Sequence, residues 1–121
     1  MKLAKNFCIA ALLSLGVVAP VLAECAYPTK PGAPPSGAKA TQEEMVVAMK
    51  ASRQFDTDVK NYQACLNTET EAMIAALGDN PSEAAIKDIK AKQDMKFSAA
   101  YNDAVRVTEA FNVQLRAFKA K

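Results

Sequence analysis

Histidine and tryptophan are absent from this chain of 121 residues. The lack of histidine removes the commonest general base and the commonest metal ligand of proteins. Acidic residues cluster at positions 43–44, 56–58 and 69–71, but side chains one or two positions apart on a helix point in different directions. None of these clusters forms the paired carboxylates of an acid–base site. We therefore expect no catalytic, cofactor-binding or metal-binding residues, and we predict that the protein is not an enzyme.

The chain also lacks an apolar run long enough to span a bilayer, which takes about 20 residues. Its longest run, residues 7–19, has 13 residues and follows Lys2 and Lys5, which is the pattern of a secretory signal peptide. Residues 21–23 (VLA) match the small-residue site of signal peptidase, so cleavage is predicted between Ala23 and Glu24. A retained membrane anchor is one alternative. Lipidation of Cys25 is another, although the charged Glu24 is unsuited to a lipidation site. The predicted location is the periplasm, or outside the cell if the protein is fully secreted.

Neither sign of charge is in excess after this cleavage. Loss of Lys2 and Lys5 reduces the 15 basic residues to 13, which equals the 13 acidic residues. A neutral chain with interspersed charges has no electrostatic footprint for nucleic acid or for an anionic membrane. We expect no nucleic-acid partner and no stable membrane insertion once the signal is removed. The partner is expected to be another protein or a second copy of this chain in a homodimer.

Cysteine is scarce as well, because Cys8 leaves with the signal and only Cys25 and Cys65 remain. In an oxidising compartment an even count of cysteines indicates a bridge. A Cys25–Cys65 disulfide would close a loop of about 40 residues, which contributes about 4 kcal/mol of stability in the chain-entropy model. An intermolecular disulfide is the alternative. A catalytic dithiol is disfavoured because the chain has no Cys-x-x-Cys motif.

Residues 24–40 are rich in proline and glycine. Pro28, Pro31 and Pro34 recur every third residue, which is the period of a polyproline II helix, so they share one face. We predict an extended strap that lies on the protein's own helices; a PxxP ligand for a partner is the alternative. Cys65 lies about 36 Å along a helix that starts at Thr41, and 16 strap residues can span about 50 Å. The strap can therefore reach Cys65.

The remainder, residues 41–121, reads as a helical hairpin with a helix over 41–77, a turn over 78–80 and a helix over 81–119. Thr41 and Glu44 form a capping box at the start of the first helix, and Gly78 suits the position after its end. Asn80 is the expected N-cap of the second helix, with Pro81 as its first residue.

Apolar residues in both helices recur at steps of three and four, as a coiled-coil seam requires. Folding at the turn places Tyr62 opposite Phe97 and Phe55 opposite Ala104, so that large residues face small ones. The fold class is thus all-α: an antiparallel two-helix hairpin with a proline-rich strap held by a disulfide. The predicted seam comprises Met45, Met49, Ser52, Phe55, Val59, Tyr62, Leu66, Met73 and Leu77, with Ile86, Ile89, Gln93, Phe97, Ala100, Ala104, Val107, Phe111, Leu115 and Phe118.

Three features of these helices each allow two interpretations. Met45 and Met49, one turn apart, could bind Cu(I) through their thioethers or simply fill gaps in the core. Asn112 and Gln114 could bridge to the strap or to a partner. Apolar residues off the seam could be scattered exposed side chains, or an association surface for a second hairpin or an unfolded client. They are Val46, Val47, Ile74, Met95, Val105 and Val113.

The chain resembles a family of small exported proteobacterial proteins that has no assigned activity. The resemblance supports the fold and the bridge and implies no mechanism. It is carried by Cys25, Pro31, Pro34, Gly37, Ala40-Thr41, Met45, Phe55, Tyr62-x-x-Cys65-Leu66, Tyr101-Asn102-x-Ala104 and Phe111-Asn112-x-Gln114-Leu115-x-Ala117-Phe118-Lys119.

Together these observations predict a non-catalytic, periplasmic, helical binding or structural module whose partner is not identified. The alternative is a holdase-like envelope-stress chaperone that uses the off-seam apolar residues. A redox or metal-binding protein is the least favoured.

Overall fold

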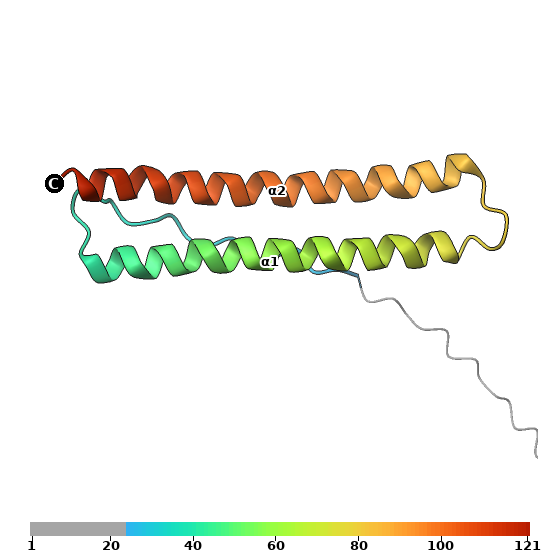
Figure 1. The fold of residues 1–121 in the computed structure, drawn as a ribbon, viewed down its shortest axis with the longest axis horizontal. Coiled ribbons are helices and arrows are strands. Elements are labelled where there is room, and N and C mark those ends of the chain that lie inside the picture. Colours follow the sequence, from blue (N-terminus) through green and yellow to red (C-terminus); the bar gives the residue numbers. More distant parts are fainter. Residues whose placement is uncertain (1–23) are drawn as a thin grey trace, which may run out of the picture.

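The computed structural model describes residues 24–121; the predicted signal peptide, residues 1–23, and with it Ala23 of the predicted cleavage site, lie outside the described residues. The described chain contains two helices, α1 (Gln42–Ala75) and α2 (Glu83–Lys119), and no β-strand. They run antiparallel, and the extended strap of residues 24–40 lies along them from the end that carries the C-terminus to beyond the middle of the hairpin (Figure 1). The predicted all-α hairpin with a disulfide-linked strap is confirmed.

Helix α1 begins with the predicted capping box. The backbone N–H of Glu44 donates to the Thr41 hydroxyl at 3.2 Å, and the Thr41 N–H donates to the Glu44 carboxylate at 2.8 Å. Thr41 is thus the cap, and the helix itself starts at Gln42. Its end comes at Ala75 and not at residue 77, because the chain tightens into i→i+3 bonds there, including Gly78 N–H to the Ala75 carbonyl. Gly78 takes a φ of 90°, which glycine adopts without a steric penalty.

Helix α2 begins later than predicted. Its N-cap is Ser82, whose hydroxyl accepts the Ala85 N–H at 3.2 Å. The expectation that Asn80 caps the helix with Pro81 at its first position is therefore wrong. Asn and Ser are both favourable N-cap residues. Pro81 still belongs to the turn, so the helix is capped by Ser82 and not by Asn80. The connection thus covers residues 76–82. Helix α2 ends at Lys119, as predicted, with basic residues in the last turn.

The register of the two helices agrees with the prediction. Gln63 donates its side-chain N–H to the Phe97 carbonyl at 3.5 Å, and Gln93 donates to Asn67 at 2.6 Å. Phe55, which is 2 % exposed, packs in one cluster with Ala100 and Ala104. Small residues on α2 therefore let the large residues of α1 fill the seam.

Two predicted seam residues are exposed. Met73 is 42 % exposed and Leu77 is 40 % exposed, whereas Thr70 is buried. The strap supplies a third layer up to the Cys25–Cys65 bond, and the end of the hairpin near the turn lies beyond it (Figure 1). Two helices alone cover less of their seam than two helices and a strap. Within residues 24–121, neither helix combines the length and apolarity needed to cross a membrane.

Candidate functional site

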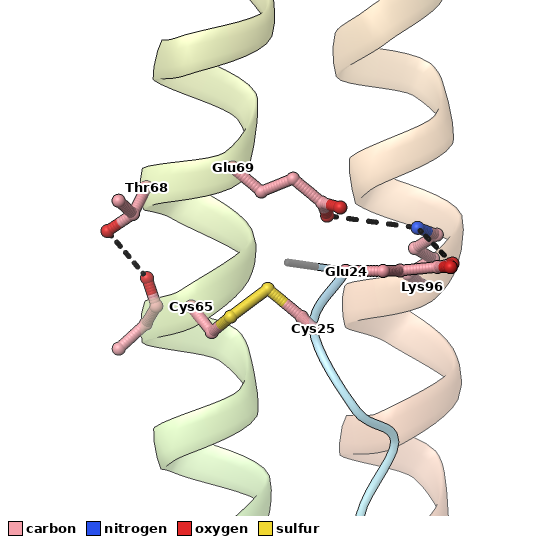
Figure 2. Close-up of a disulfide and its surroundings, with 7 residues drawn as sticks. Glu24, Cys25, Cys65, Thr68, Glu69 and Lys96 are labelled. Atoms are coloured by element: carbon pink, nitrogen blue, oxygen red, sulfur yellow. Dashed lines mark hydrogen bonds and ion pairs between the residues drawn. A yellow bond between two sulfur atoms is a disulfide. The ribbon is translucent and has the colours of Figure 1, made fainter. Parts of the chain in front are cut away.

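The predicted disulfide joins Cys25 of the strap to Cys65 of α1, with their Cα atoms 5.9 Å apart (Figure 2). This separation lies within the usual range for a disulfide. Lys96 of α2 lies beside it: its ammonium is 3.9 Å from the Glu24 carboxylate and 3.8 Å from that of Glu69. The three charged side chains come from the strap, α1 and α2 and point toward one another (Figure 2). Glu24 and Lys96 are exposed, whereas Glu69 is half-buried. The pair of Lys96 with Glu24 is open to solvent, so it orients the strap more than it stabilises it.

Tyr27 fixes the N-terminal part of the strap to both helices. Its hydroxyl donates to Asp103 at 2.7 Å, and its ring meets that of Tyr62 edge to face at 5.2 Å. Partial burial, aided by this hydrogen bond, raises the pKa of Tyr27 to about 12. The donated hydrogen bond, aided by the Lys30 ammonium at 3.4 Å, lowers the pKa of Asp103. Both shifts favour the pair of a neutral phenol and a charged carboxylate.

Gly37 fixes the other end of the strap. Its backbone N–H donates to the Gln114 side chain at 2.9 Å, so Gln114 bridges to the strap. A Cβ at this position would lie 1.8 Å from the Gln114 carbonyl oxygen, which means that the strap and α2 touch backbone to backbone. The Lys121 ammonium donates to the carbonyl of the buried Ala40 nearby. Sequence reasoning did not assign Gly37 this contact, although glycine in an extended segment can signal a close backbone approach.

The three spaced prolines lie as predicted. Pro28, Pro31 and Pro34 are half-buried, whereas the intervening residues 29–30 and 32–33 are exposed. Every third strap residue thus faces the helices. The face of the strap that carries these prolines lies against the protein's own helices. The alternative interpretation, a PxxP ligand, requires this face to be free for a partner.

Two hollows remain on this side of the hairpin. The first, which we name the strap pocket, has a volume of about 530 Å³ and lies between the strap and the helices. It is lined by strap residues 31–35, by Glu43, Glu44, Val47, Ala48, Ala51 and Ser52 of α1, and by Val107 and Phe111 of α2.

The second hollow, the open groove, has a volume of about 260 Å³ and lies between the helices beyond the end of the strap. Lys96 and Glu69 line it, and these are the residues paired beside Glu24. The groove therefore begins where the strap stops. Its other lining residues are Leu66, Thr70, Met73, Ile89, Lys92, Gln93 and Met95.

The off-seam apolar residues do not form one surface. Val47, 67 % exposed, lines the strap pocket, and Met95, 73 % exposed, lines the open groove. Val105 lines a separate hollow with Val59 and Tyr101, away from the strap. Val46 and Val113 are exposed as well, and Ile74 is half-buried. The structure thus divides them among different faces.

The two methionines considered for copper pack in the core near Phe111. Met45 is 4 % exposed and Met49 is half-buried against the same cluster. Residues 24–121 hold no group of three or more cysteine, aspartate or glutamate side chains arranged to bind a metal ion.

Comparison of the chain with protein-family models, with curated proteins and with solved structures finds no match. The resemblance to small exported proteobacterial proteins stays a prediction from the sequence.

Proposed function

We propose that this protein is an exported, non-catalytic binding module that holds an extended segment of a protein partner in its open groove. One observation carries the proposal: the groove between the helices continues past Glu24, where the strap no longer covers it and apolar side chains at its sides stay exposed. Leu66 forms the inner part of the groove floor and is 1 % exposed, whereas Met73 and Met95 at its sides are 42 % and 73 % exposed.

The strap itself indicates what kind of chain this groove accepts. It is extended, it buries one residue in three, and polar side chains of α2 fix its backbone and its tyrosine hydroxyl. A partner segment that continues the line of the strap would meet the apolar floor and, at its edges, Lys92, Lys96 and Glu69. Such a segment would combine small or apolar side chains with charges of both signs. The open groove is thus continuous with an interface that the chain already makes with itself.

Export is supported by the disulfide, because such bonds persist in oxidising compartments. The predicted signal peptide adds to this, and the periplasm is the proposed location. Intact mass of the protein purified from cell fractions tests both points. We expect loss of residues 1–23 and of two further hydrogen atoms, removed when the disulfide forms, in the periplasmic fraction. A full-length mass in the membrane fraction, an added diacylglycerol or two free thiols would each contradict this part of the proposal.

Site-specific photo-cross-linking tests the binding site. A photoreactive residue at Met95 should capture a partner, and the same residue at Tyr101, which is 59 % exposed and lines a different hollow, should not. Met73→Glu should abolish capture from position 95, because a carboxylate would then enter the apolar floor. Equal capture from both positions would refute the open groove as the site. Capture of a second copy of this chain would show self-association in its place.

A holdase-like chaperone is a second candidate, favoured by the exposure of Met95 and Val47 on different surfaces. Flexible methionine side chains are common at surfaces that accept many partners. This candidate is tested by measuring whether the protein suppresses aggregation of a heat-denatured enzyme. Heat is used because a reductant would open the disulfide. Strong suppression at equimolar ratio, lost in Met95→Lys, would favour the holdase over a module with one partner.

A further inference from the structure

The strap pocket is enclosed by a span of chain that is held at both ends. Tyr27 is bonded to Asp103 before the span, and Gly37 is bonded to Gln114 after it. Between these anchors Gly32 is exposed and a Cβ built on it would meet no atom within 4 Å, so this side of the strap faces solvent, while strap residues 31–35 line the hollow. Prolines restrict the backbone of the span and stiffen it. The hollow beneath it is therefore preformed and is not closed by collapse of the strap.

The interior of the pocket is apolar and its volume suits a small molecule. Val47, Ala48 and Ala51 of α1 form one side, and Val107 and Phe111 of α2 form the other. Ligand pockets of proteins typically measure about 300–1,000 Å³ and combine apolar walls with a few polar groups that orient the ligand. The strap pocket, at about 530 Å³, lies within this range.

Both charged residues that line the pocket are acidic. They are Glu43 and Glu44, and no lysine or arginine is among its lining residues. Glu44 also accepts the capping hydrogen bonds from Thr41, whereas Glu43 makes no ion pair or side-chain hydrogen bond with any residue of the described range. The N-terminus of α1 contributes about half a positive charge, which two carboxylates outweigh. The mouth of the pocket is therefore negative.

We propose that the strap pocket binds a small amphiphilic cation, an alkylammonium whose hydrocarbon chain lies against Val47 and Val107 and whose ammonium meets Glu43. An alkyl carboxylate of the same length would fit the apolar walls but would face two like charges. An alcohol would gain the apolar contacts without the ion pair. This ligand site is distinct from the open groove and goes beyond the binding function proposed for it.

Binding of three ligands of equal chain length to the mature, disulfide-bonded protein tests the proposal. Hexylammonium should bind and shift the methyl resonances of Val47, Ala51 and Val107 in NMR spectra. Hexanol should shift the same methyls with about fivefold weaker affinity, the size of one exposed ion pair. Hexanoate should bind more weakly still. Equal affinities for the three ligands, or shifts confined to other methyls, would overturn the proposal.

Matched variants separate charge from fold. Glu43→Lys should weaken hexylammonium and strengthen hexanoate, and Glu109→Lys, an exposed carboxylate that lines a different hollow, should change neither. Ala51→Leu should fill the pocket and weaken all three ligands while the helical circular dichroism is unchanged. If Ala51→Leu disturbs the fold, the reversed preference of Glu43→Lys between hexylammonium and hexanoate still tests the proposal. If N-acetyl-lysine amide binds and hexylammonium does not, the pocket accepts a peptide side chain and the proposal is overturned.

Discussion

Replacement of Gly37 by alanine should release one end of the strap. The new Cβ would lie 1.8 Å from the Gln114 carbonyl oxygen and 2.8 Å from the Phe118 nitrogen. Ordinary contacts of a Cβ begin at 3.4 Å, so the strap must retreat by about 1.6 Å. Because the obstructing atoms belong to the α2 backbone, no side-chain rotation relieves the overlap. The hydrogen bond of 2.9 Å from Gly37 N–H to Gln114 would be lost with this movement.

The cost follows from these two effects. Overpacking against a rigid neighbour costs about 1–3 kcal/mol, and a lost hydrogen bond costs about 1 kcal/mol. We therefore expect Gly37→Ala to lower the free energy of unfolding by about 2–4 kcal/mol. The loss of stability has an upper limit, because this end of the strap can detach while both helices persist.

Gly32→Ala is the matched control, because it makes the same chemical change in the same strap. No atom lies within 4 Å of a Cβ built there. We expect this variant to be unchanged or more stable by about 0.5 kcal/mol, since alanine restricts the unfolded chain more than glycine does. Urea unfolding followed by circular dichroism gives both free energies, and hydrogen exchange at the residue 37 amide reports release of the strap. Equal stability of the two variants, with a protected amide at residue 37, would refute the close backbone contact.

Four further predictions concern the strap and the turn. Changing Cys25 and Cys65 to serine should cost about 4 kcal/mol in urea unfolding, the chain-entropy value for a loop of this length, and an unchanged midpoint would contradict it. One tyrosine should titrate at about pH 12 in the ultraviolet spectrum and shift downward in Asp103→Asn; its persistence in Tyr27→Phe would contradict the assignment. The lowered pKa of Asp103 adds stability above its ordinary value of 3.8, and this stability is lost as the pH falls through the folded value. The raised pKa of Tyr27 adds stability below its ordinary value of 10.0, and this stability is lost as the pH rises through about 12. The free energy of unfolding measured in urea should therefore decrease at both extremes of pH, and a constant value would contradict this. Gly78→Ala should cost about 1 kcal/mol because of its φ of 90°, and no change in thermal unfolding would contradict this.

The helices and their pairing followed from local patterns. Thr41 and Glu44 predicted the start of α1, and the spacing of large and small residues predicted the register of Phe55 with the alanines of α2. The start of α2 could not be predicted as well. Asn80 and Ser82 have similar intrinsic ability to cap, and the path of the turn chooses between them.

The two hollows were harder to predict than the helices. Val47 and Met95 stood out in the sequence as apolar residues off the seam, but their separation into different surfaces depends on where the strap lies. Glu43 and Glu44 looked like a solvated acidic pair of a first helical turn. Their place at the mouth of an apolar pocket comes from residues 31–35, which belong to another segment.

The sequence by itself determined the presence of two long helices, the start of the first, their pairing and the reach of the strap to Cys65, because these depend on residue spacing and chain length. The tertiary structure alone decided which backbone atoms of the strap touch α2 at Gly37, where the third layer ends and which apolar side chains stay uncovered. These depend on three segments meeting in space. A close contact such as that of Gly37 with Gln114 fixes them within about an ångström, a precision that residue spacing does not carry.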